Sequence, residues 1–282
     1  MDFQYTDITG RYRMLSFYRE CAIIQVSHRV LYGYPEENGM FRALYTLFVF
    51  IGQLIRHIAM GRKLGKLPPQ ERMDQSLRTI VKVGERTIQA TGSRVIYHGV
   101  ENIPDEPVYI AANHQSVFDV FVLLAEMDRP SAFIAKKSLA KVPLLHKWLE
   151  LLGCLYLDRE DARQAVKVMR QAANQMTEYK MNMIVFPEGT RSRGGELHPF
   201  KKGNLKPAFM AKVPVLPAFI DGTAGIFEGN RGLCVKPTEV HVYFGQPIPT
   251  KDMDRQAENE LAEQIGGIIT ALREPAGQDD KT

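Results

Sequence analysis

Cysteine is scarce in this sequence, and its cysteines form none of the patterns found in metal sites or disulfide frameworks. The 282 residues include Cys21, Cys154 and Cys234, with no C-x-x-C pair among them. An odd number of isolated cysteines in a chain of this size indicates free thiols in a reducing compartment. The sequence therefore predicts neither a disulfide framework nor a metal site.

Several motifs that define other classes of protein are also missing. The absence of a P-loop and of G-x-G-x-x-G argues against a nucleotide-dependent enzyme, and we expect no cofactor. The absence of G-x-S-x-G disfavours a serine esterase. No aromatic–basic RNA motif occurs, so we expect no nucleic acid partner. Asp2 and Asp7 stand where a signal peptide carries basic residues, and no apolar run follows them, so we expect the catalytic part in the cytoplasm.

A long uninterrupted hydrophobic run is absent as well. The most apolar stretch, residues 40–60, is uninterrupted only over 43–52 apart from Thr46, whereas an ordinary spanning helix needs about 20 apolar residues. On a helical wheel its polar residues fall in a narrow stripe and apolar residues cover the rest. The stripe consists of Arg42, Thr46, Gln53, Arg56 and His57. This pattern favours an in-plane or partly inserted membrane helix.

Two other interpretations of this stretch stay open. It could be a helix buried in the core with its polar stripe in water, or a true span, which two arginines and a histidine make costly in lipid. Residues 11–32 form another mixed apolar and basic segment, which could pair with it as a helical hairpin. The net charge of +4 is mild, but Arg and Lys are in clear excess over the first 70 residues, as suits an anionic membrane surface. We therefore predict that residues 1–68 are N-terminal membrane-associating helices.

The remaining sequence alternates strand-like and helical segments. Pro68-Pro69 marks a break, after which residues 70–91 have the periodicity of an amphipathic helix. Strands are expected at 94–97, 108–112, 132–135, 155–157, 183–186, 215–219 and 240–244, and helices at 117–127, 142–152, 160–179, 204–211 and 254–272. This alternation predicts an α/β fold, a mixed sheet flanked by helices, in a catalytic domain of residues 69–282.

A histidine and an aspartate follow the second expected strand. In N-H-Q-S-V-F-D, residues 113–119, His114 leaves the strand and Asp119 lies on the first turn of the next helix. From there Asp119 can reach back to the imidazole, fix its tautomer and stabilise its protonated form, as the aspartate of a catalytic triad does. The spacing from Ser116 to Asp119 also fits a capping box, so a helix-start carboxylate beside a hydrogen-bonded loop histidine is the structural alternative.

A cationic loop follows the fifth expected strand. In F-P-E-G-T-R-S, residues 186–192, Pro and Gly enforce a tight turn, and Arg191 offers a planar fork suited to phosphate. Lys201 and Lys202 stand just ahead of a helix start, which itself attracts anions. Arg159 ends G-C-L-Y-L-D-R, after a strand on what should be the same sheet edge. The alternatives are a solvated basic loop and, for Arg159, a salt bridge to Asp158 or Asp161.

Together these segments resemble the glycerolipid acyltransferase family, most closely its bacterial 1-acyl-sn-glycerol-3-phosphate acyltransferases. The family block N-H-x-x-x-x-D matches residues 113–119, and G-x-x-x-x-x-R matches 153–159. F-P-E-G-T-R-S matches residues 186–192 at every position, and an apolar block around two prolines matches V-P-V-L-P at 213–217. All four blocks occur in the family's order and at its usual spacings, over about residues 80–250.

The resemblance implies a role for each matched residue. His114 would be the general base, and Asp119 would orient it. Lys136 or Lys137 lies where the family often carries a lysine near the developing oxyanion. The acceptor's phosphate would be held by the second and third blocks and the lysines that follow, namely Arg159, Glu188, Gly189, Thr190, Arg191, Lys201 and Lys202, with Glu188 and Gly189 shaping the loop. The fourth block would line the acyl path with Val213, Pro214 and Pro217.

The implied reaction moves a fatty acyl group from acyl-CoA or acyl carrier protein to the 2-hydroxyl of 1-acyl-sn-glycerol-3-phosphate, giving phosphatidic acid for phospholipid biosynthesis. Acylation of glycerol-3-phosphate or another lyso-lipid by the same site is the main alternative. An esterase and a non-catalytic membrane or nucleic-acid binder are further alternatives. The expected partners are lysophosphatidic acid, the acyl donor and membrane lipids. We expect a monotopic or peripheral protein at the cytoplasmic face of the cell membrane.

Overall fold

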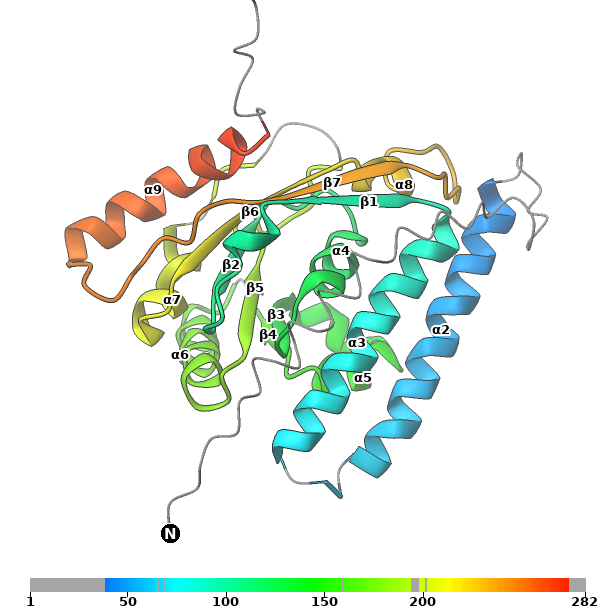
Figure 1. The fold of residues 1–282 in the computed structure, drawn as a ribbon, viewed down its shortest axis with the longest axis horizontal. Coiled ribbons are helices and arrows are strands. Elements are labelled where there is room, and N and C mark those ends of the chain that lie inside the picture. The colour runs from blue at the N-terminus through cyan, green and yellow to red at the C-terminus, as the bar shows by residue number, and fades with distance from the viewer. Residues whose placement is uncertain are drawn as a thin grey trace, which may run out of the picture. The chain divides into compact units, whose positions relative to one another are not determined.

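One mixed sheet forms the centre of the computed structural model, which describes residues 39–64, 66–67, 69–158, 160–193, 198–200 and 202–273 (Figure 1). Its strands are β1 (Arg94–His98), β2 (Tyr109–Ala112), β3 (Ser131–Lys136), β4 (Leu155–Leu157), β5 (Asn182–Val185), β6 (Val215–Asp221) and β7 (Glu239–Phe244). Their order is β1-β7-β6-β2-β5-β3-β4. The five strands from β6 to β4 are parallel, β7 is antiparallel to β6, and β1 is parallel to β7. The α/β fold with a mixed sheet is confirmed, and each strand lies where the sequence predicts one.

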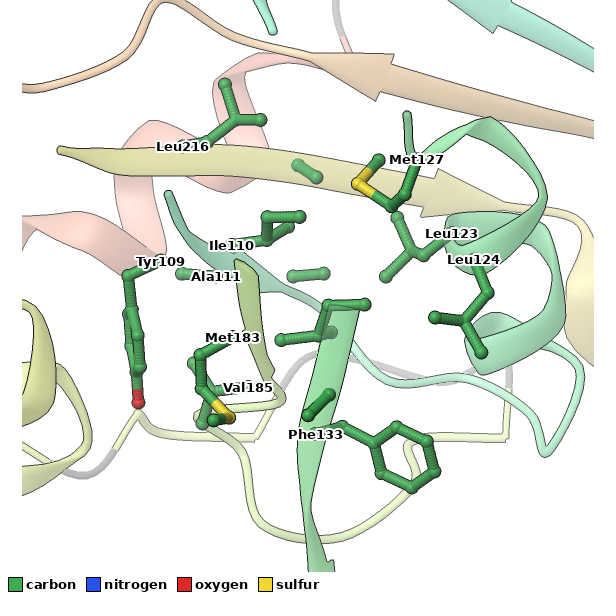
Figure 2. Close-up of a cluster of buried hydrophobic side chains, with 14 of the residues drawn as sticks. Tyr109, Ile110, Ala111, Leu123, Leu124, Met127, Phe133, Met183, Val185 and Leu216 are labelled. Carbon is green, nitrogen blue, oxygen red and sulfur yellow. The ribbon is translucent and has the colours of Figure 1, made fainter. Parts of the chain in front are cut away.

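The central strands are buried on both faces, which explains why they are continuous apolar runs in the sequence. Every residue of β2 and β5 is buried, and so is all of β6 except Asp221. Parallel strands between two helix layers require this composition, because both of their faces meet apolar side chains. Figure 2 shows part of the resulting core, in which Ile110 of β2, Met183 of β5 and Leu216 of β6 are buried. Leu123 and Leu124 of helix α4 (Asp119–Glu126) belong to the same core.

Helices cover both faces of the sheet. On one side lie α6 (Ala162–Glu178), α7 (Lys206–Ala211) and α9 (Arg255–Ala271), and on the other lie α3 (Pro69–Thr91), α4 and α5 (Leu145–Leu151) (Figure 1). These helices occupy the positions that the sequence predicts. The short elements α8 (Thr223–Ile226), η1 (Val100–Asn102), η2 (Lys137–Lys141) and η3 (Lys202–Leu205) were not predicted as separate elements.

Helix α2 (Gly39–Leu64) packs on α3 and α5 (Figure 1). Its apolar face is exposed. Its polar Thr46 and His57 are buried, whereas Phe48 is 75% exposed. The other exposed large hydrophobic side chains of α2 are Met40, Phe41, Leu44, Tyr45, Leu47, Ile51 and Ile55. This is the reverse of a soluble amphipathic helix, so the alternative of a helix buried in the core is wrong.

The length and composition of α2 would also allow it to cross a membrane. The uninterrupted run over 43–52 understates the helix, because isolated polar residues within a longer apolar helix are tolerated. The expected partner segment, residues 11–32, lies outside the described residues. Residues 39 onward belong to one compact unit, in which α2 packs with the sheet-covering helices. The division of the chain after residue 68 stays a prediction.

Candidate active site

The predicted site segments that follow β2, β3, β4 and β5 lie at the carboxyl ends of the parallel strands. Because β2, β3, β4, β5 and β6 are parallel, their carboxyl ends point the same way. The His114 segment follows β2, and the Arg191 loop follows the adjacent strand β5. Lys136 ends β3, and Asp158 follows β4 at the edge of the sheet. Crevices at the carboxyl ends of parallel strands are the usual ligand sites of α/β proteins.

His114 and Asp119 form a hydrogen-bonded pair at these strand ends. The imidazole Nδ1 lies 2.7 Å from Asp119 Oδ2; the histidine side chain is 18% exposed and the aspartate is fully buried. The imidazole stacks on Phe186, with ring centroids 4.1 Å apart. Since a carboxylate only accepts hydrogen bonds, the pair places the proton on Nδ1 and leaves Nε2 as the nitrogen able to take up a proton.

The carboxylate of Asp119 is held by three further donors. The backbone N–H groups of Gln115 and Ser116 donate to Oδ2 at 2.6 and 2.9 Å, and the Thr223 hydroxyl donates to Oδ1 at 2.5 Å. The bond from Ser116 N is the one expected of a capping box. The reciprocal bond of a capping box is replaced, because the Asp119 backbone N–H donates to the Ser116 carbonyl and Phe118 is the N-cap of α4. The role of Asp119 in orienting His114 stays a prediction.

Thr223 begins α8 just after β6, so it arrives at the site from a third strand. Thr223 was not among the predicted site residues. Its signal was its place directly after a buried strand, in D-G-T at 221–223. Asn113 fixes the same junction, because its fully buried amide exchanges two hydrogen bonds with the backbone of Ile220.

Glu188 ties the cationic loop to the histidine. Its buried carboxylate accepts the His114 backbone N–H at 2.6 Å and the His198 backbone N–H at 3.0 Å. Burial raises the pKa of this carboxyl group, and the two backbone donors oppose that rise. Ser192 adds a second tie, from its backbone N–H to the carbonyl of His114 at 2.8 Å. Glu188 therefore links the loop to the His114 backbone, and its oxygens accept from amides within the protein. Its part in holding a phosphate stays a prediction.

The turn itself follows from Gly189, whose φ of 72° lies in the left-handed region that glycine enters without strain. Thr190 and Arg191 come next and are exposed. Arg191 Nη1 donates to Glu228 Oε1 at 2.6 Å, so the guanidinium is anchored on one side. Glu228 was not predicted. It belongs to no motif, and its 37-residue separation from Arg191 gives no local signal.

The other predicted cations lie further along these strand ends or outside the described residues. Lys136 and Lys137 are exposed at the end of β3, two strands from β2, and Lys137 Nζ pairs with Asp158 Oδ2 at 2.9 Å. This hydrogen bond raises the pKa of Lys137 and lowers that of Asp158. Arg159 and Lys201 lie outside the described residues, and Lys202 is described by its backbone in η3.

The fourth block lies away from the histidine. Val213 and Pro214 are buried just before β6, at the amino end of the parallel strands, whereas His114 follows their carboxyl ends. The carbonyl of Pro214 accepts the backbone N–H of Tyr109 at the start of β2, and Pro217 pairs with Ala111 within the sheet. The structure therefore does not bring this block to the other site residues. Its role as an acyl path stays a prediction.

No cluster of three or more His, Cys, Asp or Glu side chains that could hold a metal ion occurs among the described residues. What these strand ends offer instead is a histidine hydrogen-bonded to a buried carboxylate and, on a loop fastened beside it, an exposed guanidinium. Such a pair can accept a proton from a bound hydroxyl, and the guanidinium can bind an anion.

Comparison with known proteins identifies relatives of this chain among the acyltransferases. A family model described as "Acyltransferase" matches residues 94–221. The 1-acyl-sn-glycerol-3-phosphate acyltransferase of Cocos nucifera is 30% identical over 66% of this chain, which spans 59% of that relative's length. A probable 1-acyl-sn-glycerol-3-phosphate acyltransferase of Mycoplasma genitalium is 32% identical over 80% of this chain and 86% of its own length. The crystal structure of the 1-acyl-sn-glycerophosphate (LPA) acyltransferase, PlsC, from Thermotoga maritima is similar with a TM-score of 0.71 and 27% identity, over 86% of this chain and 98% of that one.

The shared fold and the matched family model define the class as an α/β acyltransferase. Since the similarity to the Mycoplasma relative extends over most of both chains, this chain belongs to the 1-acyl-sn-glycerol-3-phosphate acyltransferase family.

Proposed function

We propose that this protein transfers a fatty acyl group from an acyl thioester to the 2-hydroxyl of 1-acyl-sn-glycerol-3-phosphate, giving phosphatidic acid. The observation that carries the proposal is the His114–Asp119 pair, fastened through Glu188 and Ser192 to the loop of Arg191. A base for a hydroxyl and a cation for a phosphate thus lie on neighbouring loops. The names of the relatives support the same acceptor.

The reaction begins at His114. Nε2 accepts the proton of the 2-hydroxyl as that oxygen attacks the thioester carbonyl, and the buried Asp119 stabilises the imidazolium that forms. The tetrahedral intermediate collapses when its carbon–sulfur bond breaks, and the departing thiolate takes the proton back from Nε2. General-base assistance of this kind contributes about 10²–10⁴-fold.

The acceptor's phosphate is held by Arg191, whose exposed guanidinium can present two parallel donors to phosphate oxygens. Gly189 and Thr190 shape and border this anion site, and Arg159, Lys201 and Lys202 add positive charge to it. Backbone N–H groups or a lysine, Lys136 or Lys137, meet the oxyanion. The salt bridge of Lys137 with Asp158 makes Lys136 the better candidate of the two.

Direct transfer within a ternary complex is favoured over an acyl-enzyme. The Ser116 hydroxyl, near the histidine in sequence, donates to Glu228, and the Ser192 hydroxyl donates to the His114 carbonyl. Cys154 is buried, and burial raises the pKa of its thiol. None of these groups is activated by His114, as a nucleophile for an acyl-enzyme would need to be. The donor is acyl-CoA or acyl carrier protein, and the reaction uses no further cofactor.

The protein binds the cytoplasmic face of the cell membrane as a monotopic or peripheral enzyme. The exposed apolar face of α2 would enter the lipid, as in-plane amphipathic helices do. A cleft of about 200 Å³ between α2 and α3 is lined by Arg56, Lys82 and Arg86, beside the apolar face. These cations suit the phosphates of anionic lipids at the level of the headgroups.

The first experiment measures free thiol and phosphatidic acid with detergent-purified protein, palmitoyl-CoA and 1-acyl-glycerol-3-phosphate. We expect thiol release that depends on the acceptor and is largely lost in His114→Ala. His98→Ala, on the edge strand β1, is the matched control and keeps its activity. Acyl carrier protein donors and a panel of lyso-lipids and glycerol-3-phosphate then define the substrates. Thiol release without an acceptor would contradict the proposal and indicate a thioesterase.

A further inference from the structure

Glu228 joins the two loops of the candidate site. Its Oε1 accepts hydrogen bonds from Arg191 Nη1 at 2.6 Å and from the Val117 backbone N–H at 2.8 Å. Its Oε2 accepts the Ser116 hydroxyl at 2.5 Å. The side chain is only 8% exposed. A buried carboxylate with three donors is fixed in position, because breaking any contact leaves a polar group unpaired.

One end of this link is the loop that orients the base. Ser116 also donates its backbone N–H to Asp119 Oδ2, and Val117 lies between Ser116 and the start of α4. Glu228 is therefore connected to the carboxylate that orients His114 through a single intervening residue. Any movement of Glu228 relative to the histidine would have to break these contacts.

The other end of the link is Arg191. Its side chain is 45% exposed, and within the described part of the chain Glu228 is the acceptor that this guanidinium bonds. That contact uses Nη1, so the donors of Nε and Nη2 stay available to a ligand. An arginine held in this way has already lost most of its rotamer freedom, so binding an anion costs less entropy.

We propose that Glu228 is a positioning residue that holds Arg191 at a set distance from His114, so that the site selects acceptors carrying a phosphate next to the reacting hydroxyl. In 1-acyl-glycerol-3-phosphate the free hydroxyl is on C2 and the phosphate is on the adjacent carbon, C3. A phosphate bound to the open side of Arg191 places that hydroxyl near the base. The inference rests on the proposed function and assigns acceptor selectivity to a residue outside the sequence blocks.

The test is Glu228→Gln in the full-length protein, since glutamine has the same shape and can still accept from Val117. We expect the KM for 1-acyl-glycerol-3-phosphate to rise roughly tenfold, because the hydrogen bond that holds Arg191 loses its ionic partner and is weakened. The KM for the acyl donor and the pH dependence of kcat stay as in the wild type. The preference for this acceptor over 1-monoacylglycerol falls by the same factor. Glu239→Gln, an exposed carboxylate on β7, is the matched control and changes none of these values.

A double variant separates positioning from general damage. If Glu228 acts through Arg191, then Glu228→Gln adds nothing to the acceptor KM of Arg191→Gln. Additive effects of the two substitutions on the acceptor KM would overturn the inference. So would an unchanged acceptor KM in Glu228→Gln. A lower acceptor KM would overturn it too, because that result is expected if Glu228 occupies the position of the phosphate. An unchanged acceptor KM in Arg191→Gln would instead overturn the placement of the phosphate in the proposed function.

Discussion

At the scale of single residues, Asp119 has a structural task beside its proposed chemical one. It accepts hydrogen bonds from the His114 ring, from two backbone N–H groups and from the Thr223 hydroxyl. An ionised carboxylate can accept from all four donors, whereas an amide would turn two N–H groups toward some of them. The negative charge of Asp119 therefore lets one buried side chain accept from all four donors. In the proposed mechanism the same charge stabilises the protonated imidazole.

Asp119→Asn tests this arrangement. We expect kcat to fall by about 10²–10⁴-fold, because the amide favours the wrong imidazole tautomer and does not stabilise the protonated ring. The acceptor KM should change little, since Arg191 is untouched. Initial rates over a range of acceptor concentrations give both values. Asp254→Asn is the control, because asparagine can keep the helix cap that Asp254 provides to α9. A kcat near the wild-type value in Asp119→Asn would refute the orienting role.

The local spacing of residues predicted the contact of His114 with Asp119, but not the contributions of Thr223 and Glu228. His114 and Asp119 are five residues apart, so a strand followed by a helix turn is enough to predict their contact. Thr223 and Glu228 reach the same loop across 104 and 112 residues. Their positions depend on the order of the strands, because β6 lies beside β2 and α8 follows β6. Spacing within a single sequence carries no information about that order.

At the scale of elements, the periodicity of α2 alone left open the direction in which the helix faces, and its apolar composition favoured an apolar face turned toward lipid. A helical wheel separates a polar stripe from an apolar face in the same way whether the outer medium is water or lipid. In the structure the stripe residues Thr46 and His57 are buried. Their side-chain polar atoms have no hydrogen-bond partner among the residues that the structure describes. The strands were predictable because their burial on both faces leaves an unambiguous apolar run.

The outward face of α2 gives a membrane-binding prediction. We expect Phe48→Ser to weaken binding to vesicles of phosphatidylcholine and phosphatidylglycerol by about 1.5–3 kcal/mol, the value of one large apolar side chain moved into lipid. Co-sedimentation of purified protein at increasing lipid concentration measures the change. Val166→Ser on α6 removes an exposed apolar side chain from another helix, outside the apolar face of α2, and serves as the control. Equal binding of both variants and the wild type would show that this face does not enter lipid.

At the scale of the whole molecule, α2 belongs to the packing of the sheet-covering helices. Phe50 of α2 makes edge-to-face contacts with Phe121 of α4 and Trp148 of α5, at centroid distances of 5.3 and 5.9 Å. Leu54 is buried in the same core. The break at Pro68-Pro69 lies between two helices that pack against each other, α2 and α3. A proline pair in the sequence marks the end of a helix equally well at a tight connection and at a domain boundary.

Two truncated chains show whether Pro68-Pro69 is a tight connection between packed helices or a domain boundary. We expect a chain that starts at Gly39 to fold and to keep its acyl transfer activity in detergent, because residues 39 onward form one compact unit. A chain that starts at Pro69 should lose both, because it uncovers Phe121 and Trp148 and removes the partly buried Phe50 and the buried Leu54 side chains. Each such side chain contributes about 1.5–3 kcal/mol, a large part of the stability of a domain.

Thermal unfolding in detergent and thiol release, measured on both truncated chains and the full-length protein, give the answer. The control is Phe50→Leu in the full chain, which should lower the melting temperature by a smaller amount and leave the acceptor KM unchanged. If the chain from Pro69 melted like the full-length protein and kept its rate in detergent, residues 1–68 would form a separable membrane anchor, and α2 would contribute only lipid binding. Loss of folding in that chain would instead show that α2 is a part of the catalytic unit. The same helix would then also provide the lipid-facing surface, because it packs Phe50 against the core and exposes Phe48 on its other side.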